Sequence, residues 1–209
     1  MKTLKISIAL IVATFFSINS FACKTCGCSA KKNNHSHSEN SILKDINEEK
    51  SYVKWLAKKV TGSHEGYVSI KDAHLHFEND LLSGGTIIID MQTINCTDLE
   101  GEPKKNLENH LFSNDFFGVK KFPTASLEII KAKKIKKNSN KYNISATIEI
   151  KEIKKNIEFI AVLENGKATA ELVLDRTKFD VRYGSGSFFE NLGDNLIYDD
   201  FNLSVVIAY

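Results

Sequence analysis

Residues suited to metal binding cluster near the start of the chain. Cys23, Cys26 and Cys28 are closely spaced, and His35 and His37 follow them. Thiolate and imidazole groups at this spacing are ligands for soft or borderline ions such as Cu(I) and Zn(II). The other interpretation is a polar linker whose cysteines are reduced, oxidised together or lipidated. The segment therefore predicts either a metal site or a plain tether.

The sequence offers little support for catalysis. His64 stands in a Ser-His-Glu-Gly loop, where it is either a ligand or base or, more simply, a hydrogen-bonding support. His110 precedes Asp115 closely enough for the two to pair at a helix end. Nucleophilic catalysis needs an activated nucleophile, but neither Ser63 nor Ser113 stands in a Gly-x-Ser-x-Gly elbow. The sequence therefore predicts a protein that is not an enzyme.

Further along the chain, other polar residues have two interpretations each. His74 and His76 share one face of a predicted strand and form either a surface metal site or an ordinary solvated face. Arg176 follows Asp175 at a strand end. Its guanidinium either forms a salt bridge there or contacts a carboxylate or pyrophosphate head group. The lysine-rich run 131–137 is a solvated strand end that also suits transient contact with anionic lipids at a membrane surface.

The first 22 residues have the pattern of a secretory signal peptide. Lys2 and Lys5 precede an uncharged apolar run, 6–18, which is too short to span a bilayer. Small residues then mark a cleavage site before Cys23. We expect export to the periplasm or cell envelope, with Cys23 as either the new N-terminus or a lipid-anchored residue.

The net charge argues against a nucleic-acid-binding protein, and the cysteine distribution argues against a domain held together by disulfides. The formal net charge is +2, and the signal peptide holds two lysines and no acids, so the mature chain is near neutral. This balance argues against nucleic acid as a partner. Residues 23–50 contain few large apolar side chains and predict a flexible Cys/His-containing tail. Only Cys96 lies beyond that tail, so disulfides cannot hold the predicted domain, 51–209, together.

From residue 51 onward, apolar residues alternate with polar ones, as in strands with one buried face. The alternation shifts by one residue at Asp72-Ala73, which indicates a β-bulge, and Asn165-Gly166 is a strong hairpin signal. Closure into a barrel would protect the sheet edges, and eight strands leave room inside for side chains or one slim ligand. We expect an all-β fold, an eight-stranded antiparallel barrel, with strands around residues 53–57, 68–77, 87–91, 124–129, 142–150, 157–163, 168–174 and 201–209.

One stretch, 106–125, departs from this alternation. Leu107 and Leu111 are four residues apart and share a helical face. Phe116 and Phe117 follow, and a proline then prevents helical geometry in the residue before it. The stretch predicts a short helix between the third and fourth strands, with an aromatic end that covers one end of the barrel.

The order of these features resembles the YceI-like family, whose members are exported lipocalin-like barrels associated with polyisoprenoid binding. The resemblance runs from about residue 51 to the C-terminus and leaves out the Cys/His tail. It rests on short motifs in sequence order: Val53-Lys54-Trp55, Ser63-His64-x-Gly66, Gly84-Gly85, Ile89-Asp90-Met91, His110-Leu111, Asp115-Phe116-Phe117, Phe122-Pro123-Thr124-Ala125, Leu174-Asp175-Arg176 and Asp199-Asp200.

The resemblance implies an elongated apolar tunnel that binds a long isoprenoid or similar amphiphile without catalysis and without a cofactor. Homo-oligomerisation stays open. The alternative function is a metal-binding envelope protein that uses the Cys/His tail. If the tunnel exists, we expect the ligand to contact aromatic side chains and one guanidinium: Trp55, Phe116, Phe117, Arg176, Phe188 and Phe189.

Overall fold

The computed structural model describes residues 41–209. The predicted signal peptide lies outside these residues, as do the candidate metal ligands Cys23, Cys26, Cys28, His35 and His37. Within the described part, no helix is long and apolar enough to cross a membrane. In chain order the elements are β1 (Ser41–Asp45), η1 (Glu48–Lys50), β2 (Tyr52–Lys59), β3 (Gly62–Glu78), β4 (Leu81–Cys96), α1 (Gly101–Phe112), β5 (Thr124–Lys134), β6 (Lys141–Ile150), β7 (Ile153–Glu164), β8 (Lys167–Asp175), η2 (Arg176–Phe179), η3 (Gly193–Asn195) and β9 (Ile197–Ala208).

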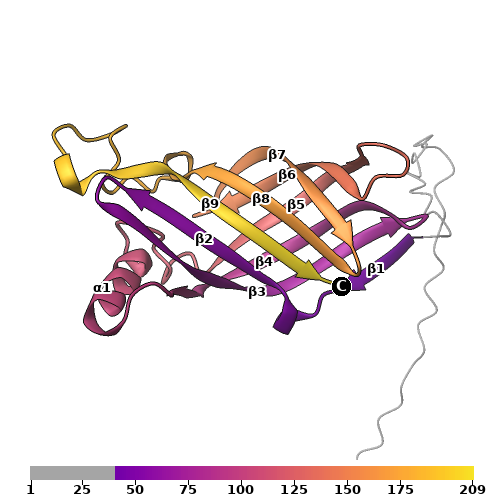
Figure 1. The fold of residues 1–209 in the computed structure, drawn as a ribbon, viewed down its shortest axis with the longest axis horizontal. Coiled ribbons are helices and arrows are strands. Elements are labelled where there is room, and N and C mark those ends of the chain that lie inside the picture. Colours follow the sequence, from indigo (N-terminus) through magenta and orange to yellow (C-terminus); the bar gives the residue numbers. More distant parts are fainter. Residues whose placement is uncertain (1–40) are drawn as a thin grey trace, which may run out of the picture. The chain divides into compact units, whose positions relative to one another are not determined.

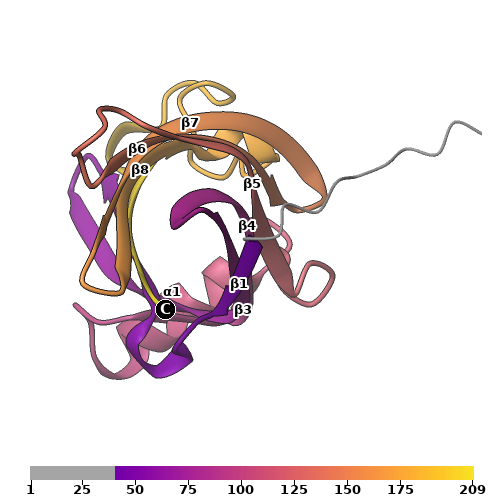
Figure 2. The same ribbon diagram turned by 90° about the vertical axis from the view of Figure 1, so that its right-hand side faces the viewer.

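Eight of the strands form a closed antiparallel barrel. The hydrogen-bonded order runs β3-β2-β9-β8-β7-β6-β5-β4, and a further pairing of β3 with β4 closes the ring. Seen end-on, the strands surround a common axis (Figure 2). Closure pairs the main-chain groups that an open sheet would leave at its edges. The predicted eight-stranded barrel, with one helix between its third and fourth strands, is confirmed.

A ninth strand, β1, pairs with the same edge of β3 as β2 does, further along β3. It pairs with β3 from Ser41 opposite Glu78 to Asp45 opposite His74. Strand β1 and the short helix η1 therefore lie within the segment that the sequence assigned to the flexible tail, 23–50. All five residues of β1 are exposed, so its sequence carries no alternation between buried and solvated positions. It is held by main-chain pairing rather than by burial.

The turns and the bulge follow local residue preferences. Asn165 and Gly166, the predicted hairpin turn between β7 and β8, both have positive φ, 52° and 72°, as a type I′ turn requires. Asn79 and Asp80 do the same between β3 and β4, at 50° and 63°. The register of β3 on β4 shifts between Ile70 and Asp72, so the predicted bulge is confirmed.

The barrel interior is built by alternation. On β6 the buried residues are Tyr142, Ile144, Ala146, Ile148 and Ile150, with less buried residues between them. Burying an aliphatic side chain of this kind contributes about 1.5–3 kcal/mol relative to leaving it in water. The other strands contribute to the same core, so burial holds the barrel together without a disulfide among residues 41–209.

Helix α1 lies at one end of the barrel, while β1 and the C-terminus lie at the other (Figure 1). Leu111 is the buried residue of the helix. The chain then turns tightly, with Phe117 N–H donating to Leu111 O and Val119 N–H donating to Phe112 O. It returns to the barrel where Met91 N–H donates to Pro123 O. This geometry positions Phe116 and Phe117 against the barrel interior and leaves Asp115 exposed.

Candidate ligand cavity

The barrel interior holds two adjoining apolar cavities. One has a volume of about 100 Å3 and the other about 120 Å3. They lie next to each other, since five residues from five strands line both: Val53, Ile89, Ala125, Ile148 and Leu203. Cavities with such linings stay dry and accept apolar ligands.

The two cavities follow one another along the barrel. The larger borders the α1 end, because Leu111, Phe116 and Phe117 line it. The smaller borders the opposite end, where Leu75 and Ile144 line it. Two residues further along the same strands, Phe77 and Tyr142 line a polar hollow at the barrel mouth. The order is thus mouth, smaller cavity, larger cavity, α1.

Four of the six residues expected to contact a ligand line the cavity at the α1 end: Trp55, Phe116, Phe117 and Arg176. The structure does not bring Phe188 and Phe189 to either cavity. They are 46 % and 50 % exposed, and they follow Ser185 in a surface turn where both N–H groups bond to its carbonyl. Their aromatic character alone did not distinguish a surface turn from a tunnel wall.

Phe116 is the centre of an aromatic cluster at the α1 end. It is 7 % exposed, and its ring centroid lies 5.0 Å from that of Phe117 and 5.5 Å from that of His110. His110 also packs edge-on against Tyr183 at 4.3 Å. Asp115 is exposed, and no ion pair joins it to His110 in the described part of the chain. The expected pairing of these two residues is absent because the turn directs the imidazole inward, where its Nε2 is buried without a hydrogen-bond partner.

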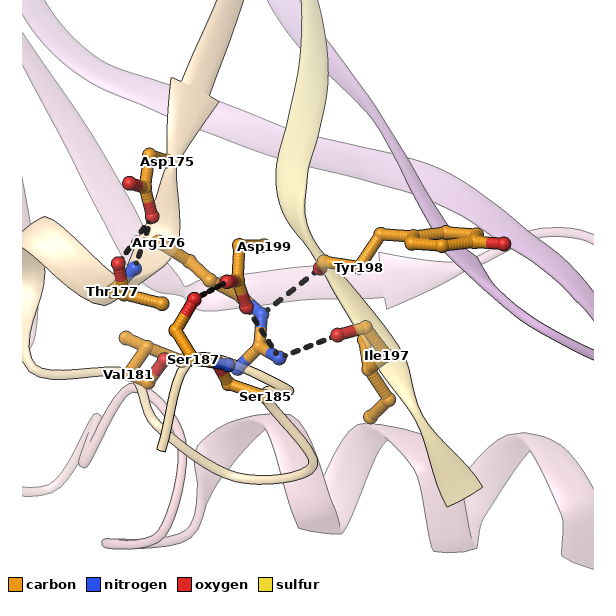
Figure 3. Close-up of polar contacts among 9 residues, drawn as sticks. All are labelled: Asp175, Arg176, Thr177, Val181, Ser185, Ser187, Ile197, Tyr198 and Asp199. Atoms are coloured by element: carbon orange, nitrogen blue, oxygen red, sulfur yellow. Dashed lines mark hydrogen bonds and ion pairs between the residues drawn. The ribbon is translucent and has the colours of Figure 1, made fainter. Parts of the chain in front are cut away.

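Arg176 is buried, with 3 % of its surface exposed, and its donors are used by main-chain carbonyls (Figure 3). Nε donates to Tyr198 O at 3.1 Å, Nη1 to Val181 O at 2.9 Å and Nη2 to Ile197 O at 3.0 Å. Nη2 also lies 3.5 Å from a carboxylate oxygen of Asp199. This geometry favours the salt-bridge interpretation of Arg176 over the head-group interpretation. Burial acts to lower the pKa of Arg176, while the carboxylate of Asp199 opposes that shift.

The opposite mouth carries lysines beside aromatic rings. Lys44 Nζ lies 4.6 Å from the ring centroid of Phe77 and 4.9 Å from that of Tyr209. Lys134 Nζ lies 5.9 Å from the ring centroid of Tyr142. With Lys137, these two lysines line the polar hollow, and none of the three forms an ion pair within residues 41–209. Lys44 was missed from the sequence because it lies on β1.

Two further histidines of the barrel, His64 and His74, are paired with carboxylates. His74 Nδ1 lies 2.9 Å from Asp45, and its Nε2 lies 3.4 Å from Asp72. His64 Nδ1 lies 2.9 Å from Asp98, in agreement with its interpretation as a hydrogen-bonding support. Although burial acts to raise it, hydrogen bonds from the Glu65 N–H, the Cys96 thiol and His64 bring the pKa of Asp98 down to about 2.

Comparison with known protein families assigns this barrel to a family. The YceI-like domain matches residues 45–209. The chain belongs to the YceI-like family. Comparison with curated proteins gives no match.

Solved structures share the fold of this YceI-like chain. BcnA of Burkholderia cenocepacia is 19 % identical with a TM-score of 0.62, covering 79 % of this chain and 99 % of its own. A polyisoprenoid-binding domain from Saccharophagus degradans, implicated in plant cell wall breakdown, is 11 % identical with a TM-score of 0.53, covering 78 % and 95 %. A Campylobacter jejuni YceI protein is 20 % identical with a TM-score of 0.51, covering 68 % and 82 %. At these identities the likeness concerns the fold.

Phe117→Ala in this YceI-like barrel is expected to loosen the α1 end of the cavity. Phe117 is partly buried and packs against Phe116, so we expect a loss of about 1–2 kcal/mol in the free energy of unfolding, less than for a fully buried ring. The release rate of a bound apolar ligand should rise several-fold. Thermal unfolding and ligand-release kinetics measure the two effects. Phe189→Ala is the matched control and should change neither; equal effects in both variants would contradict a role for Phe117 at the cavity.

Asp98→Asn is expected to destabilise the protein in a pH-dependent way. The folded-state pKa of Asp98, about 2, lies below the ordinary 3.8. The carboxylate therefore contributes stability that is complete above about pH 4 and is lost as the pH falls to about 2. Because Asp98 is partly exposed, we expect roughly 1 kcal/mol at neutral pH. Denaturant unfolding in a chelator at several pH values checks this, with the exposed Asp115→Asn as control; a difference that stays constant down to about pH 2 would contradict the assignment.

Proposed function

We propose that this YceI-like protein is an exported carrier that holds the chain of a polyisoprenoid or similar long apolar amphiphile inside the barrel. The observation that supports it is the pair of adjoining apolar cavities, in which Arg176 is the sole charged lining residue. Removing apolar area from water contributes about 25 cal/mol per Å2, so a long chain gains affinity without a covalent step. Each cavity is small, with a volume of about 100–120 Å3, which favours a slender chain over a bulky ring system.

The polar head of the ligand belongs, in this proposal, at the lysine-bearing mouth. Lys44, Lys134 and Lys137 line the polar hollow there together with Asp80, and within the described residues none of these lysines forms an ion pair. At the other end, the Arg176 guanidinium is already bonded to three carbonyls and lies beside Asp199. An anionic head group would be stabilised by the free ammonium groups and would compete with existing bonds at Arg176. The same lysines suit loading from an anionic membrane surface.

The test is the lipid content of the protein from its native host. Protein purified without detergent is analysed by native mass spectrometry and by solvent extraction, and delipidated protein is then titrated with prenyl lipids of increasing length. We expect a co-purifying lipid and saturable binding. Lipid-free protein that also fails to bind every prenyl lipid offered would contradict the carrier function.

Export and anchoring are tested separately. We expect the protein in the periplasm or cell envelope, as the signal pattern of residues 1–22 predicts. Fractionation of cells and the mass of the mature N-terminus distinguish a cleaved chain that begins at Cys23 from one that carries an acyl group. A full-length precursor in the cytoplasm would contradict export.

A further inference from the structure

Three metal-ligating side chains meet outside the ligand cavity, where the end of β4 crosses the start of β3. The ligand atoms of His64, Cys96 and Asp98 all lie within 4.8 Å of one another. Cys96 is fully buried, whereas the side chains of His64 and Asp98 are 26 % and 30 % exposed. The thiol therefore forms the floor of the cluster, and the imidazole and carboxylate form its rim toward solvent.

The backbone around the cluster is fixed on both sides. Glu65 N–H donates to Asp98 at 2.9 Å, and Thr97 N–H donates to Glu65 O at 2.9 Å. Cys96 N–H donates to Glu108 of α1 at 2.9 Å. Gly66, opposite Cys96 in the register, allows this approach, because a Cβ there would stand 1.8 Å from Asn95 O. The three ligand-bearing residues are thus held in place by the barrel and the helix.

The Cys96 thiol and the His64 imidazole both contact Asp98 at the position that a metal ion would take. The Cys96 thiol donates to one oxygen of Asp98 at 3.1 Å, and His64 Nδ1 lies 2.9 Å from the other oxygen. The thiol and the imidazole therefore both contact one carboxylate. Metal binding displaces the thiol proton, whereas the imidazole binds as the neutral ring. A single divalent cation would then occupy the position toward which both side chains point.

The distances suit zinc. Zn–S bonds of about 2.3 Å and Zn–N and Zn–O bonds of about 2.0–2.2 Å place the ligands of one tetrahedral ion roughly 3.3–3.6 Å apart. Cys96 contacts Oδ1 of Asp98 and His64 contacts Oδ2. These contacts need to lengthen by about half an ångström to reach that range, and the ligand atoms farthest apart, which lie within 4.8 Å, need to move closer. A mixed sulfur, nitrogen and oxygen set fits a borderline ion better than Cu(I), which prefers soft ligands.

The cluster is poorly suited to nucleophilic catalysis. Burial raises the pKa of the Cys96 thiol, and the thiol donates its proton to the carboxylate rather than to the imidazole. A nucleophilic cysteine needs the opposite conditions, a lowered pKa and an adjacent base. A metal ion that coordinates the sulfur displaces the thiol proton directly, so metal binding needs neither a lowered thiol pKa nor an adjacent base.

We propose that His64, Cys96 and Asp98 form a Zn(II) site with one position open to solvent. The site is independent of the lipid cavity and of the N-terminal Cys/His segment. It uses His64 of β3, Cys96 at the end of β4 and Asp98 from the loop that follows β4. The exposed rim leaves the fourth position to water.

The test uses the mature chain with Cys23, Cys26 and Cys28 replaced by serine, so that Cys96 is its sole thiol. Titration with Co(II) as a spectroscopic substitute should give a thiolate-to-cobalt charge-transfer band, which the remaining histidines cannot produce. Zn(II) should abolish that band by competition and should raise the midpoint of thermal unfolding. Because the three tail cysteines are replaced, a thiolate-to-cobalt band in this variant must come from Cys96 of the barrel.

Variants at the rim keep the proposal testable if substitution of the buried thiol prevents folding. His64→Gln and Asp98→Asn should each weaken Co(II) binding about tenfold or more. His76→Gln, on the same strand and without an ion pair in the described residues, is the control and should leave binding unchanged. The proposal is overturned if no thiolate band forms, or if the band persists at wild-type affinity in both rim variants.

Discussion

Replacing Arg176 by methionine is expected to lower the free energy of unfolding by about 3–5 kcal/mol, the loss observed when one partner of a buried charged network is removed. The substitution leaves the carbonyls of Tyr198, Val181 and Ile197 without the donors that they accept from now. It also leaves Asp199 without its guanidinium partner. Chemical unfolding at neutral pH measures the loss.

Lys178→Met is the matched control, because Lys178 belongs to the same short helix, η2, but its side chain is 64 % exposed. Its ion pair with Asp175 at 3.5 Å lies at the surface, and such pairs contribute about 0–1 kcal/mol. In a double-mutant cycle, Asp199→Asn should destabilise the Arg176→Met background less than it destabilises the wild type.

The cycle also separates the two interpretations of Arg176. If the guanidinium serves the fold, Arg176→Met reduces stability and changes ligand affinity only through that loss. If Arg176→Met leaves stability unchanged while head-group affinity falls, the residue is a ligand contact and the structural role assigned to it is wrong.

The barrel could be predicted because the sequence signals for its strands and turns lie between residues that are close together in the chain. Strict alternation, as on β6, fixes which face of a strand is buried, and Asn165-Gly166 fixes a turn. The one-residue slip at Asp72-Ala73 located a bulge for the same reason. β1 was not predictable, since all its residues are exposed and main-chain pairing with β3 holds it.

The candidate site was only partly predictable because its contacts are not local. Arg176 bonds to carbonyls that lie up to 22 residues away in the sequence, and His64 meets Asp98 across 34 residues. Phe116 and Phe188 each belong to a Phe-Phe pair in an irregular segment, yet one is buried and the other is exposed. Only the closure of the barrel decides which pair lines a cavity. The Cys96-x-Asp98 spacing was a local signal, but its histidine partner was not.

Ala125→Phe is expected to give the largest loss of lipid binding. Ala125 is buried on β5 and lines both cavities, so a phenyl ring there would fill the junction through which a long chain must pass. We expect binding of long prenyl lipids to weaken about tenfold or more, since a chain confined to one cavity loses roughly half its buried apolar area. The added volume should reduce stability by only about 1–3 kcal/mol. Equilibrium titration with prenyl lipids and thermal unfolding measure the two quantities.

The control for Ala125→Phe is Glu128→Phe, which places the same side chain on the exposed face of the same strand and should leave binding unchanged. Ala57→Phe then tests the direction of the ligand, because Ala57 lines only the cavity at the α1 end. If the head group lies at the lysine-bearing mouth, Ala57→Phe should reject long chains and still accept short ones, whereas Ala170→Phe, in the cavity next to that mouth, should reject both. The reverse pattern would place the head group at the α1 end, and unchanged binding in all three interior variants would mean that the chain does not occupy the barrel.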